Sequence, residues 1–91
     1  MPVNVRIPAP LQDLTDGQSQ VQCEGSTVSD VLTHLDVGYP GLKDRICDET
    51  GTIRRFVSIY VNEDDVRFLQ SEATPVKDGD EISIIPALAG G

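Results

Sequence analysis

The stretch Gly25-Ser26-Thr27-Val28-Ser29-Asp30-Val31-Leu32-Thr33-His34-Leu35 predicts the one long helix of this chain and decides its fold class. Thr27 is a good N-cap residue, and Asp30 places a carboxylate in the first turn in near-capping-box fashion. The apolar stripe follows the i, i+3, i+4, i+7 spacing of one helix face: Val28, Val31, Leu32 and Leu35. A helix with one apolar face buries it against another layer, so the flanking segments should supply that layer.

Those flanking segments carry the patterns of β-strands. Alternating apolar and polar residues mark two strands before the helix, joined by a connection that ends at the turn Asp16-Gly17. After the helix, Pro40 opens a short second helix that carries Leu42 and Ile46. A polar turn over residues 62–65 separates two later strands, and Pro86 ends the last one. The predicted strands cover residues 3–7, 20–24, 56–61, 66–68 and 81–85.

The order of these elements predicts an α+β fold, with a mixed sheet of four to five strands, one main helix and a short second helix. The chain has 91 residues, enough for one small domain. Its formal charge of −8 argues against a nucleic-acid partner, because phosphate binding needs clustered basic residues. That charge could steer the domain toward basic partners or simply keep it soluble. We expect a cytoplasmic protein, since no stretch approaches the ~20 apolar residues of a membrane span and residues 1–11 lack the pattern of a signal peptide. We also expect the chain to be a monomer on its own, without a membrane partner.

No side-chain active site or metal site is visible in the sequence. Phosphate-loop, dinucleotide, nucleophile-elbow and zinc-protease motifs are absent. Cys23, Cys47 and His34 are too few for a structural zinc site, and we expect buried, inert thiols and a solvated histidine. The acidic run at residues 63–65 fits a solvated turn better than a calcium loop. We therefore expect no catalytic residue, metal or cofactor in this chain.

The sequence ends in Leu88-Ala89-Gly90-Gly91, where two glycines expose a bare α-carboxylate on a narrow stem. Chance supplies two glycines at a given position in roughly one chain in 200. The carboxylate is ionised at neutral pH and is a poor acyl donor. Reaction with ATP would convert it to an acyl-adenylate, which a sulfur nucleophile turns into a thiocarboxylate and an amine into an amide.

Several motifs join this ending: TVSDVL at residues 27–32, YPGL at 39–42, YVN at 60–62, VKDGDEI at 76–82 and PALAGG at 86–91. Over nearly the whole chain they resemble the ubiquitin-like β-grasp proteins of the ThiS/MoaD sulfur-carrier family. Ala89 before the glycines is similar to bacterial sulfur carriers and departs from ubiquitin, which has arginine there. Residues 55–62 and 65–68 most closely resemble the CysO branch, which carries sulfide for cysteine synthesis.

The resemblance implies a ubiquitin-like β-grasp domain over residues 1–87 and a flexible tail over residues 88–91. It implies that an adenylyltransferase resembling ubiquitin-activating enzymes grips Leu88, Ala89, Gly90 and Gly91 and uses MgATP to adenylate Gly91. Sulfur transfer then leaves a thiocarboxylate at Gly91. In the CysO branch a pyridoxal-phosphate cysteine synthase adds the sulfur to an activated serine, and a zinc metallopeptidase frees cysteine. The ATP, magnesium, pyridoxal phosphate and zinc belong to those partners, and this chain is a carrier rather than an enzyme.

A docking surface beside the tail is also predicted. Alternation along residues 81–85 puts Ile82 and Ile84 on one face and Ile85 on the other. Ile85 and Pro86 are candidates for partner docking, unless the preceding hairpin covers Ile85. Phe68 and Tyr60 are further candidates, although such residues more often pack on a sheet.

Other functions stay open on the sequence alone. A protein modifier joined to lysines through Gly91 would share the adenylate. The small subunit of a molybdopterin synthase would share the thiocarboxylate, whereas thiamin carriers are usually shorter than this chain. In a plain interaction module the two glycines would be incidental.

Overall fold

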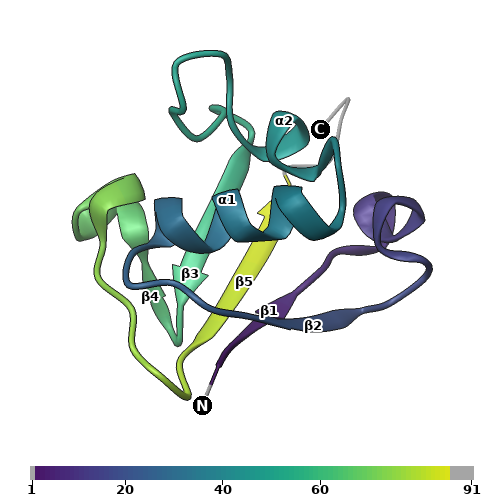
Figure 1. Cartoon of the computed structure of the whole chain (residues 1–91). Coiled ribbons are helices and arrows are strands. Elements are labelled where there is room, and N and C mark those ends of the chain that lie inside the picture. Colours follow the sequence, from purple (N-terminus) through teal and green to yellow (C-terminus); the bar gives the residue numbers. More distant parts are fainter. Residues whose placement is uncertain (1, 87–91) are drawn as a thin grey trace.

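The computed structural model describes residues 2–86 and shows a five-stranded mixed sheet with one main helix across one face (Figure 1). Met1 and residues 87–91 lie outside the described residues. The strands are β1 (Val3–Arg6), β2 (Gln20–Cys23), β3 (Val57–Val61), β4 (Asp64–Asp65) and β5 (Glu81–Pro86). The helices are α1 (Val28–Gly38) and α2 (Leu42–Ile46), with 3-10 helices η1 (Ala9–Thr15), η2 (Val66–Phe68) and η3 (Ser71–Ala73). The predicted α+β class, mixed sheet and pair of helices are confirmed.

The last strand, β5, lies in the middle of the sheet, in the order β2-β1-β5-β3-β4. It runs parallel to β1, where Val5 is opposite Ile82, and antiparallel to β3, where Ile59 is opposite Ile84. The other two pairs, β1 with β2 and β3 with β4, are antiparallel. The first half of β5, Glu81 to Ser83, therefore has a partner strand on both sides, and the strand's C-terminal end is held by the ladder with β3.

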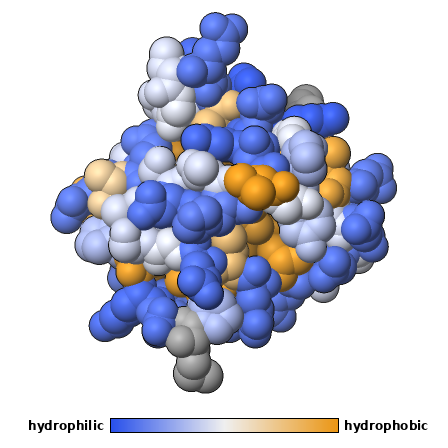
Figure 2. All heavy atoms as spheres, viewed as in Figure 1, coloured by the Kyte–Doolittle hydropathy of each residue, from blue (hydrophilic) through white to orange (hydrophobic). Residues whose placement is uncertain are grey.

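The apolar stripe of α1 packs onto the sheet as its spacing predicted. Thr27 caps the helix, because its hydroxyl accepts a hydrogen bond from the Asp30 backbone N–H at 3.1 Å. The Asp30 carboxylate reaches back to Ser26, whose hydroxyl donates to it at 2.7 Å, rather than to the Thr27 N–H of a capping box. These bonds to Ser26 hold the pKa of Asp30 below its ordinary value. The face that carries α1 is largely hydrophilic, with a small hydrophobic cluster near its middle (Figure 2).

The predicted short strand over residues 66–68 is wrong, because that segment is η2 and the paired strand is β4. Asn62, with a φ of 58°, turns the chain so tightly that Asp64 already lies opposite Val61. The Asp65 carboxylate then accepts a hydrogen bond from the Arg67 backbone N–H at 2.9 Å and starts η2. That turn carries Val66 into the core.

The second helix begins two residues later than predicted, at Leu42 rather than Pro40. Gly41 is its N-cap at a φ of 96°, a conformation that side chains oppose. The Asp36 carboxylate accepts hydrogen bonds from the Gly41 and Lys43 backbone N–H groups at 3.1 and 3.2 Å, which fixes the start of α2 against the end of α1. Leu42 and Ile46 are fully buried, as their spacing predicted. Within residues 2–86, no helix has the length and apolar character needed to cross a membrane.

We expect two isoleucines of β5 to differ sharply in their contribution to stability. Replacing Ile82, which is completely buried, with alanine should lower the free energy of unfolding by about 3 kcal/mol through lost burial and a cavity. Ile85→Ala makes the same chemical change on the opposite face and should cost less than about 1 kcal/mol. Urea denaturation checks both, and equal losses would contradict the assignment of faces.

Candidate functional site

The predicted reactive and gripped residues Leu88, Ala89, Gly90 and Gly91 lie outside the described residues. The structure instead describes the base from which this segment departs. Pro86, the last described residue, still pairs with Val57 at the end of the β3–β5 ladder. The predicted boundary between a domain ending at residue 87 and a tail over residues 88–91 stays a prediction.

That base is a rigid one. Ile82 and Ile84 are buried, and β5 pairs with β1 over residues 81–83 and with β3 over residues 82–86. On the other face, Arg6 Nε lies 3.0 Å from Glu81 Oε2 between the two central strands. This exposed ion pair adds little stability, so packing and the two ladders hold β5 in place. A partner that takes hold of the chain beyond Pro86 thus meets a fixed strand end.

The outer face of β5 exposes the predicted docking residue. The Ile85 side chain is 50% exposed, so the preceding segment does not cover it. Ser58 on β3 lies opposite Ile85 in the ladder. Arg67 Nη2 donates to the Val57 carbonyl at 2.9 Å and to Ser58 Oγ at 3.0 Å, which brings η2 beside this end of β3. Phe68, the next residue along η2, is 86% exposed.

The two remaining docking candidates are less exposed. Pro86 and Tyr60 are both half-buried. Tyr60 lies opposite Ser83 on β5, farther from the strand end than Ile85. The structure therefore brings Ile85, Pro86 and the η2 segment of Phe68 around one end of β3, and sets Tyr60 apart from them.

The inner side of the same strand end carries a groove that the sequence reasoning missed. Phe56 lines it and is 55% exposed. Its residues come from η1, α2, the segment before β3, β3 and β5: Leu11, Asp44, Arg45, Arg54, Phe56, Val57, Ile84 and Pro86. The signal was available, because Arg54-Arg55-Phe56 directly precedes β3, and an antiparallel partner of β5 must begin where β5 ends.

Hydrogen bonds fix one wall of this groove. Arg54 Nε donates to the Asp44 carbonyl at 3.0 Å, and the Arg54 backbone N–H donates to the Ile46 carbonyl at 2.9 Å. Both bonds join the segment before β3 to α2. The groove wall is consequently tied to a helix whose apolar residues are buried, rather than to a free loop.

The two thiols lie in surroundings that disfavour the reactive thiolate. Burial is the main cause that raises the pKa of both Cys23 and Cys47 above the ordinary value. Cys47 is buried, whereas Cys23 is half-buried and its Sγ lies 3.5 Å from the Val31 carbonyl oxygen. These surroundings fit inert thiols rather than nucleophiles.

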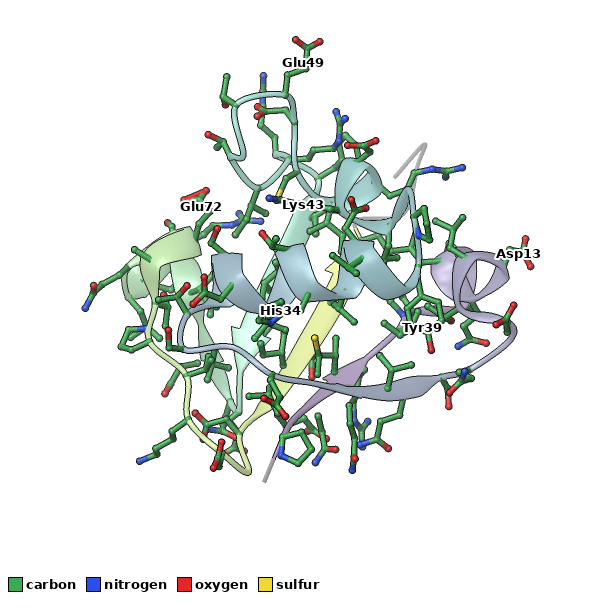
Figure 3. All side chains as sticks on the ribbon, viewed as in Figure 1. Asp13, His34, Tyr39, Lys43, Glu49 and Glu72 are labelled. Carbon is green, nitrogen blue, oxygen red and sulfur yellow. The ribbon has the colours of Figure 1, made fainter. Side chains whose placement is uncertain are left out.

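His34 is exposed and points from α1 toward the segment that follows β2, where its Nδ1 contacts the Glu24 carbonyl oxygen (Figure 3). Among residues 2–86, no three His, Cys, Asp or Glu side chains gather in a way that could hold a metal ion. The described residues can therefore serve as a base for the segment that follows Pro86, and they can contact a partner on both faces of the sheet at that strand end.

Comparison with protein families gives one match over most of the chain. The ThiS family model matches residues 5–91. The chain is also 44% identical over 93 residues to the "Sulfur carrier protein CysO" of Mycobacterium tuberculosis, covering all of both chains.

Solved structures agree with this likeness. The crystal structure of M. tuberculosis CysO superposes with a TM-score of 0.90 at 42% identity, over 94% of this chain and 99% of the other. The Amycolatopsis orientalis BexX/CysO complex contains a chain that matches at a TM-score of 0.93 and 39% identity, over 98% and 99% of the two chains. Small archaeal modifier protein 1 of Methanosarcina acetivorans matches at 0.82 and 34%, over 98% and 95%. The predicted ubiquitin-like β-grasp fold is confirmed.

We expect the half-buried thiol to titrate at higher pH in the folded chain than in the unfolded one. In a Cys47→Ala variant, Cys23 is the remaining thiol, and its alkylation by iodoacetamide reports the thiolate. Because burial raises the pKa of Cys23, the midpoint of the pH–rate profile should lie above that of the same variant in concentrated urea. The stability that goes with the neutral thiol is present below the unfolded pKa and is lost as pH rises through the folded pKa. A folded midpoint below the unfolded one would contradict this reading.

Proposed function

We propose, starting from the fact that this chain belongs to the ThiS family, that it is a sulfur carrier whose reactive group is the Gly91 α-carboxylate. One observation carries the proposal: the strand that precedes the Gly-Gly ending is held in the centre of the sheet, between β1 and β3. That arrangement suits a group that other enzymes must grip. Similarity to proteins that are named as sulfur carriers supports it.

The proposed chemistry has two balanced steps. An oxygen of the Gly91 carboxylate attacks the α-phosphorus of ATP, which forms an acyl-adenylate and releases pyrophosphate. Sulfide then attacks the acyl carbon, AMP leaves, and the sulfide proton passes to water, so that Gly91 ends in a thiocarboxylate. Both steps need partner enzymes with MgATP and a sulfur source. The chain itself acts as their cosubstrate rather than as an enzyme.

We further propose cysteine biosynthesis as the pathway. In this scheme a pyridoxal-phosphate synthase joins the carrier's sulfur to the β-carbon of an activated serine, whose activating group leaves. The resulting thioester transfers its acyl group from sulfur to the cysteine nitrogen, and a zinc metallopeptidase hydrolyses that amide, which frees cysteine and restores the Gly91 carboxylate. Full-length identity of 44% to a protein named CysO supports this branch. We propose a reducing cytoplasm as the compartment of these reactions, because they use ATP and because Cys23 and Cys47 are free thiols.

A second candidate function is a protein modifier joined to target lysines through Gly91. The likeness to small archaeal modifier protein 1, at 34% identity, favours keeping it. Both functions share the acyl-adenylate, and they differ in whether sulfide or a lysine amine attacks it. Conjugates that persist on a denaturing gel and vanish when Gly91 is deleted would favour the modifier.

The carrier function predicts a defined change in mass. Incubation with the activating enzyme from the same genome, MgATP and sulfide should raise the intact mass by the difference between one sulfur and one oxygen atom. A chain lacking Gly91 is the control and should stay unchanged. If the full chain also keeps its mass with every activating enzyme of that genome, the carrier proposal fails.

The outer face should contribute to recognition by the activating enzyme. Ile85→Ala should raise the KM for the carrier about tenfold, which corresponds to about 1.4 kcal/mol, and leave kcat unchanged, because the contact is remote from the reacting carboxylate. Val37→Ala is a matched control: Val37 is 79% exposed on α1, across the sheet from Ile85. Equal KM values for both variants and the unaltered chain would remove Ile85 from the docking surface.

A further inference from the structure

We propose that Arg45, Arg54, Arg55 and Phe56 form a basic collar on the inner side of the strand end, which docks against carboxylates at the mouth of a partner's tail-binding channel. The proposal rests on the proposed function, since it concerns the enzyme that receives the Gly91 end. It adds a second contact surface, on the opposite side of the sheet from Ile85. Its residues come from α2 and from the segment that leads into β3.

The collar surrounds two adjoining hollows. The first is the groove beneath the end of β5, which has an apolar floor that includes Leu11 and Ile84 and is bordered by Arg45, Arg54 and one acidic residue, Asp44. The second is lined by Asp48, Arg54, Arg55 and Phe56. Because Arg54 and Phe56 line both, the two hollows form one continuous surface around the base of the final segment. An apolar floor with a charged border is typical of a docking surface.

Charge makes this surface stand out from the rest of the chain. The chain has a formal charge of −8 and only seven Lys and Arg residues, of which three form the collar. Three of the other four basic side chains are engaged: Arg6 pairs with Glu81, Lys43 Nζ donates to Thr33 Oγ1, and Arg67 binds the end of β3. The fourth, Lys77, is a single exposed residue in the turn before β5. The collar is therefore where this acidic chain concentrates positive charge.

Two of the collar guanidinium groups are unoccupied within the described part of the chain. Neither the Arg45 nor the Arg55 guanidinium group forms a hydrogen bond or an ion pair there, and both residues are exposed. The nearby Asp48 carboxylate accepts hydrogen bonds from Thr50, at 2.6 Å from its hydroxyl, and these bonds hold the pKa of Asp48 below its ordinary value. An arginine fork matches a carboxylate in geometry and charge, so acidic side chains of a partner are the fitting counterpart.

The length of the final segment indicates that the collar contacts a protein surface rather than a nucleotide. Five residues follow Pro86, and an extended chain spans at most ~3.4 Å per residue, or about 17 Å in all. When an enzyme closes on an extended Gly91 end, the collar faces the mouth of its channel rather than the reacting phosphates. A positive collar on a negative carrier would orient the approach, so that the Gly91 end leads.

The test compares equal charge changes at two places. The double variant Arg45→Gln, Arg55→Gln removes collar charge without touching the Arg54 bonds. The control Lys77→Gln alters an exposed lysine in the turn before β5, at the other end of that strand. A second control, Lys77→Glu, changes the net charge by two units, as the double variant does. The readouts are KM and kcat for the activating enzyme from the same genome at low and high salt. Calorimetric binding to that enzyme without ATP accompanies them.

The collar predicts that the double variant raises KM and the dissociation constant about tenfold at low salt, with kcat unchanged and the difference shrinking at high salt. Both Lys77 variants should stay within about twofold. An equal effect at Lys77 would overturn the proposal in favour of net charge alone. The alternative is that the collar binds the C-terminal end of its own chain. In that case the Gly91 amide NMR signal would shift in the free double variant while binding to the enzyme stayed unchanged, and this result would also overturn the proposal. Calorimetry measures binding without the chemical steps, so it tests the collar even if no thiocarboxylate forms. Failure to form the thiocarboxylate would count against the proposed function alone.

Discussion

The pairing of β5 with β1 on one side and β3 on the other is the constraint on which the rest of this structure depends. Val5, Ile59 and Ile82 meet at this centre and are all buried. Because the final strand fills the gap between two strands made earlier in the chain, the core closes only when the C-terminal end is in place. The same pairing turns that end into a rigid base.

Alternation along β5 gives the strand end two different sides. Ile84 points under α1 and forms part of the groove floor, whereas Ile85, one residue on, faces the open side of the sheet. A partner that receives the following segment can therefore contact an apolar patch on one side and a basic collar on the other. Specificity from two dissimilar surfaces fits the proposed carrier function, in which several enzymes would recognise the same chain.

Much of the fold could be predicted from the sequence, because α1 and the long strands carry strong periodic patterns with a cap at Thr27. The strand β4 could not be predicted, because a strand of two residues is too short to show an alternation of apolar and polar residues. Its place is set by the turn at Asn62 and the cap at Asp65. The groove escaped prediction because Leu11, Arg45 and Phe56 come from three separate segments that only the tertiary structure unites. The role of Gly91, in contrast, comes from the sequence and the family, since that residue lies outside the described part of the chain.

The most direct test of the central claim is ATP–pyrophosphate exchange catalysed by the activating enzyme from the same genome. An acyl-adenylate at Gly91 predicts that the full chain stimulates the exchange of labelled pyrophosphate into ATP, and that a chain lacking Gly91 does not. Residues 1–90 are identical in both proteins, and the shortened chain ends in the carboxylate of Gly90. The difference therefore reports whether the reacting carboxylate must stand at Gly91. Equal exchange with both chains, or none with either, would contradict the account.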